Sequence, residues 1–211
     1  MSDILLPFKN AVSQLHEADM LLFKGTGFIG KGISFYSGGK YSHAAIVHFD
    51  NGKPYCVEQR EFRGGRSVLL KSQVDDYPGQ IDVYRAMPII QKSTTSFVDG
   101  KLVTKWTSHQ LGDIRKKEIT DLALSLTGQP YSWKNIWKFC LRFLPFIRLS
   151  QIHKTGENGD DDIPDSFVCS TVLTYCYRKV YADPCPHLSD VKTSPSDLGK
   201  SFLFSYVFTL E

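Results

Sequence analysis

The dipeptide Asn51-Gly52 constrains the fold more than any other feature, because it lies between two runs of strand-forming residues. Asn-Gly is a strong signal for a two-residue hairpin turn, since both residues readily adopt the positive φ angles that such turns need. The flanking runs, 44–49 and 54–58, are rich in β-branched, aromatic and other apolar residues. The sequence therefore predicts an antiparallel hairpin here.

A two-residue turn also fixes which residues face each other across the hairpin. The residues on either side of the turn pair first, and counting outward from them places Ala45 opposite Glu58. Because strand side chains alternate between the two faces, His43 and Glu58 lie on one face as diagonal neighbours. His48 lies on the other face. We therefore expect the Glu58 carboxylate to orient the His43 imidazole.

The length and composition are those of one globular domain. The 211 residues include 42% hydrophobic and 22% charged residues, enough for a sizeable core. We predict a single α+β domain over 1–211, with insertions at about 89–110 and 133–163. Besides the hairpin, we expect strands at 20–23, 67–70, 81–85 and 202–210, a small hairpin at 97–103, and helices at 114–126, 133–149 and 167–181.

The net charge, the N-terminal residues and the cysteine spacing limit the classes of partner and the cellular compartment that we expect. A formal net charge of +3 is too small to indicate a nucleic-acid partner. The N-terminus carries an acid at Asp3 and lacks the apolar stretch of a signal peptide, so we expect a cytoplasmic protein. The five cysteines show neither metal-binding spacing nor a disulfide framework, and the acidic run 156–162 does not fit a calcium loop. No metal or organic cofactor is expected.

Cys169 is the cysteine best placed to be a nucleophile. A thiol becomes reactive near a helix N-terminus and a histidine, both of which favour the thiolate. If Asp165 or Ser166 opens the helix at 167–181, Cys169 lies in its first turn. The free backbone N–H groups of that turn could also stabilise an oxyanion. Cys176 lies two turns deeper, where a thiol is usually a small buried hydrophobe.

Six short blocks resemble, in this order, the permuted members of the NlpC-type papain-like superfamily. The blocks are Asp19-Met20-Leu21-Leu22-Phe23, Tyr41-Ser42-His43-Ala44-Ala45-Ile46-Val47, Val57-Glu58, Gly128-Gln129-Pro130-Tyr131, Phe167-Val168-Cys169-Ser170 and Ser194-Pro195-Ser196-Asp197-Leu198. The resemblance is to the YiiX and YebB group of amidases, which is related to lecithin:retinol acyltransferase. It implies a permuted papain-like fold in which a small antiparallel sheet or partial barrel packs on the helix that carries the nucleophile.

The resemblance also implies the chemistry. Cys169 would be the nucleophile, His43 the base and Glu58 the orienting residue of a cysteine hydrolase that forms an acyl-enzyme. Candidates for substrate or oxyanion contacts within the same blocks are Tyr41, Ser42, Tyr131 and Ser170. The substrate would be a small peptide, a cell-wall peptide or a lipid-like acyl compound. Two alternatives stay open: an acyltransferase of the lecithin:retinol kind, and a non-catalytic peptide- or lipid-binding module.

Two further patterns have competing interpretations. Gly25, Gly27 and Gly30 match a dinucleotide-binding fingerprint, but only about 13 residues separate them from the next strand, too few for a crossover helix with its loops. We therefore do not expect nucleotide binding. The segment 133–149 carries many aromatic residues and a stripe of basic ones, which indicates either a peripheral membrane contact or a helix packed over the core.

Overall fold

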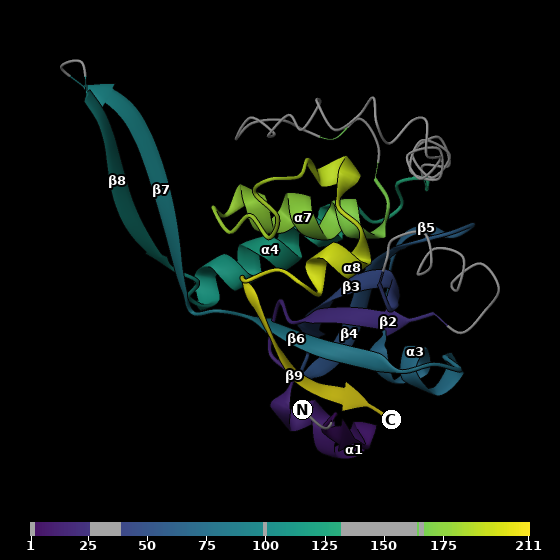
Figure 1. The fold of residues 1–211 in the computed structure, drawn as a ribbon. Coiled ribbons are helices and arrows are strands. Elements are labelled where there is room, and N and C mark those ends of the chain that lie inside the picture. The colour runs from purple at the N-terminus through teal and green to yellow at the C-terminus, as the bar shows by residue number, and fades with distance from the viewer. Residues whose placement is uncertain (1–2, 26–38, 99–100, 132–163, 165–166) are drawn as a thin grey trace.

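The computed structural model describes residues 3–25, 39–98, 101–131, 164 and 167–211. These residues form an α+β structure with a mixed seven-stranded sheet in the order β1-β9-β6-β2-β3-β4-β5 (Figure 1). The strands of this sheet are β1 (Leu5–Leu6), β2 (Met20–Lys24), β3 (Tyr41–Asp50), β4 (Lys53–Arg60), β5 (Gly64–Leu69), β6 (Ile81–Ala86) and β9 (Phe204–Leu210). The helices are α1 (Phe8–Ala11), α3 (Leu70–Asp76), α4 (Asp113–Ser125), α7 (Cys169–Lys179) and α8 (Pro195–Leu198), with 3-10 turns η1 (Val12–Gln14) and η2 (Asp190–Lys192).

The predicted hairpin is confirmed as β3 and β4. Asn51 and Gly52 have φ angles of 48° and 75°, as the turn requires. The paired residues run from Asp50–Lys53 to Ile46–Val57, which is the predicted register. The pairing between β4 and β5 extends further along β4, as far as Arg60.

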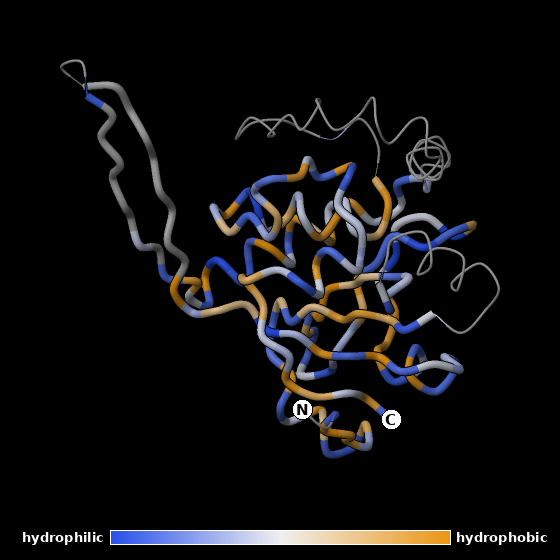
Figure 2. The backbone as a smooth tube through the Cα atoms, viewed as in Figure 1, coloured by the Kyte–Doolittle hydropathy of each residue, from blue (hydrophilic) through white to orange (hydrophobic). Residues whose placement is uncertain are grey.

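The core consists of two clusters, one on each face of the sheet. Alternate residues of β2 and β3 belong to different clusters: Leu22 and Ile46 to one, Leu21 and Ala45 to the other. The first cluster includes apolar residues of α4 and α7, and the second includes residues of α1 and α3. Figure 1 shows α4 and α7 on one side of the sheet and α1 on the other, and Figure 2 shows hydrophobic residues along the central strands between them.

Three predictions about the elements need correction. The sheet is larger than expected and is not wholly antiparallel, because β1 pairs with β9 in parallel. Helix α7 begins at Cys169 rather than at 167. Val168 is extended, with φ −117° and ψ 174°, and the Phe167 ring packs against Tyr175 with 5.6 Å between ring centroids. Ile114, the first residue of the predicted helix 114–126 and part of its apolar pattern, is 80% exposed.

The expected small hairpin at 97–103 is the outer part of a longer one. Strands β7 (Ile89–Val98) and β8 (Lys101–Gln110) pair only with each other within the described chain and project from the body (Figure 1). The N-cap candidate Ser166 and the segments 26–38, 133–149 and 156–162 lie outside the described residues. Among the helices that are described, none has the length and apolar character to cross a membrane.

Asp82 of β6 ties four strands of the sheet together through a fully buried carboxylate. It accepts hydrogen bonds of 2.6 Å from the hydroxyl of Tyr41 on β3 and from that of Thr209 on β9, and pairs at 3.2 Å with Lys24 of β2. Burial alone would raise the pKa of Asp82, but these hydrogen bonds and the Lys24 charge lower it. Asp82 is therefore ionised in the folded protein.

The substitution Asp82→Asn should destabilise the protein, because an amide loses the charge that Lys24 pairs with and weakens two strong hydrogen bonds. We expect the free energy of unfolding, measured with urea, to fall by about 2 kcal/mol. The matched change Asp121→Asn removes a carboxylate that pairs with Lys117 on the surface of α4. It should alter the free energy by less than about 1 kcal/mol, and equal effects of both changes would contradict this role for Asp82.

Candidate active site

Cys169 is the first residue of α7, at an end of the helix where backbone donors are available. No side chain caps this helix end. The Val172 N–H is the first to bond back, to the carbonyl of Val168 at 3.0 Å. The preceding N–H groups of the turn have no partner within the helix. Ser170 holds the turn in place, since its hydroxyl donates to the carbonyl of Thr193 at 2.6 Å.

His43 of β3 lies buried between an acid and an aromatic ring. Its Nε2 is 2.5 Å from Oε2 of Glu58, and its ring meets Phe23 edge-on with 5.1 Å between centroids. The two residues predicted as diagonal neighbours are therefore in contact. The other ring nitrogen, Nδ1, is buried and has no hydrogen-bond partner of normal geometry among the described residues.

Cys169 and His43 lie 126 positions apart in the sequence, but Cys169 is among the groups that shift the pKa of His43. Burial alone would lower the pKa of His43, but its interactions with Cys169 and Glu58 raise it to about 10. Since Glu58 occupies Nε2, Nδ1 is the nitrogen left for the sulfur. Cys169 is among the groups that raise the pKa of the imidazole, so the sulfur lies beside the His43 ring.

The buried Glu58 carboxylate has three partners that can carry a positive charge: His43, Arg60 and Arg66. Its Oε1 accepts from Nε and Nη2 of Arg66 at 2.8 and 2.5 Å, and its Oε2 lies 3.4 Å from Nη1 of Arg60. Arg66 in turn donates to Gln73 of α3 at 3.2 Å. Burial alone would raise the pKa of Glu58, but the charges of His43, Arg60 and Arg66 lower it to about 2.

Neither arginine was predicted as part of the site, although the sequence carries a signal for Arg66. Arg66 pairs directly with Glu58 across the β4–β5 hairpin. We predicted the second of these strands to begin at 67, and β5 begins at Gly64. A strand that started there would have placed Arg66 beside the acid. Arg60 shares the face of Glu58 because it lies two residues further along β4.

Tyr131 is a predicted substrate-contact residue that lies near Cys169. Cys169 is among the groups that shift the pKa of Tyr131. Burial raises the pKa of Tyr131, and the charges of Cys169 and Glu61 raise it further. The segment before Tyr131 is fastened to the sheet by Gln59, whose Nε2 donates to the carbonyls of Gln129 at 3.1 Å and Pro130 at 3.0 Å. Tyr131 is therefore held at the side of the Cys169 thiol.

The other candidate hydroxyls are engaged elsewhere. The Tyr41 hydroxyl donates to Asp82, and the Ser42 hydroxyl donates to the backbone carbonyl of Phe23 at 3.4 Å. The Ser170 hydroxyl donates to the backbone carbonyl of Thr193, so its proton is already used. His48, expected on the opposite face from His43, pairs there with Glu17 at 2.8 Å.

The other described cysteines are buried, and no histidine is among the groups that shift their pKa values. Burial raises the pKa values of Cys56, Cys176 and Cys185. Cys140 lies outside the described residues. Among the residues that the structure describes, no three His, Cys, Asp or Glu side chains are grouped so that they could share a metal ion.

Comparison with known proteins shows a structural likeness without a sequence family. No family model matches the chain, and no curated protein sequence matches it significantly. A solved structure does match, that of the metalloprotein YiiX (DUF1105) from Escherichia coli O157:H7, with a TM-score of 0.56 and 16% identity. The match covers 92% of this chain and 97% of that one. This chain therefore has a YiiX-like α+β fold.

Proposed function

We propose that this protein is a cysteine hydrolase on a permuted papain-like fold of the YiiX group, acting on an amide or ester through an acyl-enzyme. Cys169 is the nucleophile, His43 the base and acid, and Glu58 the residue that orients His43. One observation carries the proposal: the buried His43 has Glu58 on Nε2 and Cys169 as the neighbour left for Nδ1. This is the arrangement in which a third group orients the base of a nucleophile.

The first half of the reaction would use the thiolate of Cys169 and the Nδ1 proton of His43. The Cys169 sulfur attacks the substrate carbonyl carbon, and the carbonyl oxygen becomes an oxyanion near the backbone N–H groups that open α7. His43 then gives its Nδ1 proton to the leaving nitrogen or oxygen as its bond to carbon breaks. The product of this half is a thioester on Cys169 and a free amine or alcohol.

The second half restores the site. A water molecule attacks the thioester carbon while His43 Nδ1 takes one of its protons, and the carbon–sulfur bond breaks to release the acid and the thiolate. An acyltransferase would use another nucleophile in place of water, and a binding module would do neither step. Small peptides, cell-wall peptides and lipid-like acyl compounds fit the first half equally well.

Cys169→Ala should remove turnover, because no other described thiol lies beside His43. We expect a loss of at least about a thousandfold in kcat/KM, as for other nucleophile deletions. The measurement is a panel of amides, esters and wall peptides with the wild type and the variant. Cys176→Ala is the matched control on the same helix and should keep its activity. Full turnover by Cys169→Ala would contradict the proposal.

Glu58→Gln should lower the pKa of His43, because the amide cannot stabilise the imidazolium charge. In the wild type the imidazole signal of His43, followed by NMR, should titrate near pH 10, and in the variant several units lower. The stability that the raised pKa contributes is present below the ordinary value of 6.5 and is lost as pH rises through 10. Urea unfolding of the variant should lack this loss, and an unchanged His43 titration would contradict the orienting role.

A further inference from the structure

The Glu58 carboxylate is satisfied without Arg60. Two nitrogens of Arg66 occupy Oε1 at 2.8 and 2.5 Å, and His43 occupies Oε2 at 2.5 Å. Arg60 touches the same carboxylate through one nitrogen only, at 3.4 Å, which is outside the range of a strong charged hydrogen bond. Arg60 is therefore a second cation at a carboxylate that already has close partners.

Arg60 is the more loosely held of the two arginines at Glu58. Arg66 makes two close contacts to the Glu58 carboxylate, at 2.8 and 2.5 Å, whereas Arg60 makes one contact at 3.4 Å. Glu61 is the nearest other acid in sequence, and it makes no ion pair with Arg60 among the described residues. The Arg60 side chain is 27% exposed, whereas Glu58 beside it has no exposed side-chain surface. A loosely paired guanidinium is therefore accessible to solvent at Arg60.

Arg60 also lies on the substrate side of the site. It shares the face of Glu58, the carboxylate that contacts His43. Cys169, Glu61 and Arg60 all act on the pKa of Tyr131, so one tyrosine lies near both the thiol and the guanidinium. A molecule that places its carbonyl carbon at the Cys169 sulfur would thus have its adjoining atoms near Arg60.

We propose that Arg60 forms a subsite for a carboxylate that the substrate carries beside the scissile acyl group. N-acyl amino acids carry such a carboxylate, and so do peptides whose C-terminal residue adjoins the scissile bond. A guanidinium with free N–H groups matches a carboxylate in charge and in planar geometry. The inference deepens the proposed function and rests on Cys169 being the nucleophile. Arg66 holds the Glu58 carboxylate, and Arg60 binds the anion that arrives.

The test compares two alkylating reagents that differ only at the group that Arg60 would bind. Iodoacetate and iodoacetamide each form a bond between carbon and the Cys169 sulfur and release iodide, but the first carries a carboxylate and the second an amide. We expect Arg60→Gln and Arg60→Ala to lower the ratio of the iodoacetate rate to the iodoacetamide rate at Cys169 by about fivefold, the effect of one lost charge at this range. Mass spectrometry reads both rates at Cys169 itself.

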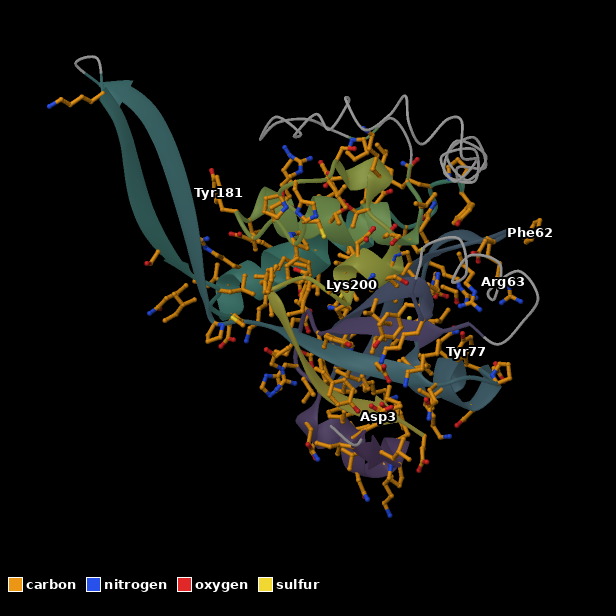
Figure 3. The ribbon with its side chains drawn as sticks, viewed as in Figure 1. Asp3, Phe62, Arg63, Tyr77, Tyr181 and Lys200 are labelled. Atoms are coloured by element: carbon orange, nitrogen blue, oxygen red, sulfur yellow. The ribbon has the colours of Figure 1, made fainter. Side chains whose placement is uncertain are left out.

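Two variants serve as controls for this ratio. Arg60→Lys keeps the charge and should keep most of the ratio. Arg63→Gln removes an equal charge at the exposed end of the β4–β5 hairpin, where Figure 3 shows Arg63 beside Phe62, and should leave the ratio unchanged. In the wild type, 1 M salt should reduce the preference for iodoacetate, since the screening length falls to about 3 Å.

The outcomes separate this inference from the proposed function. If Cys169 reacts with both reagents and the ratio is the same in the wild type, Arg60→Gln and Arg60→Ala, the carboxylate subsite is wrong and the nucleophile stands. An equal fall in Arg63→Gln would also overturn the subsite, because the effect would then come from general surface charge. If Cys169 reacts with neither reagent, the nucleophile assignment fails and the subsite fails with it.

Discussion

The buried charge of Glu58 is the feature on which the rest of the site depends. Removing a carboxylate from water costs several kcal/mol unless close partners of opposite charge replace the solvent. Here the partners come from neighbouring strands, His43 from β3 and Arg66 from β5. A shift of one residue in either register would turn one partner to the opposite face. The pairing of these three strands and the electrostatics of His43 therefore depend on each other.

Cys169 is positioned by contacts of a different kind. Helix α7 lies on the sheet through apolar residues, and polar contacts join both of its ends to the segment 189–194. Ser170 bonds to the carbonyl of Thr193 near the start, and Arg178 pairs with the buried Asp190 at 2.8 Å near the end. These contacts come from residues that follow α7 in sequence. The sheet thus supplies the imidazole and its carboxylate, and the C-terminal part of the chain sets where Cys169 meets them.

This division explains which features could be predicted from the sequence. The β3–β4 register and the contact between His43 and Glu58 follow from the Asn51-Gly52 turn and from strand alternation, and both are local properties. At the start of α7, Val168 is extended and the Phe167 ring contacts Tyr175, eight residues further along the chain. The parallel pairing of β1 with β9 joins the two ends of the described chain. Neither has a local pattern, so neither could be derived before the structure was known.

The same network decides where the proton of the site resides. The pKa of His43 is raised to about 10 and that of Glu58 is lowered to about 2, so the proton shared across their 2.5 Å contact stays on the imidazole. Two arginines at Glu58 make the carboxylate a poor proton acceptor, because protonation would leave their charges without an anion. In the proposed reaction, Glu58 would therefore orient His43 and stabilise its charge without taking its proton. The proton that His43 would give up is the one on Nδ1, the nitrogen left for Cys169.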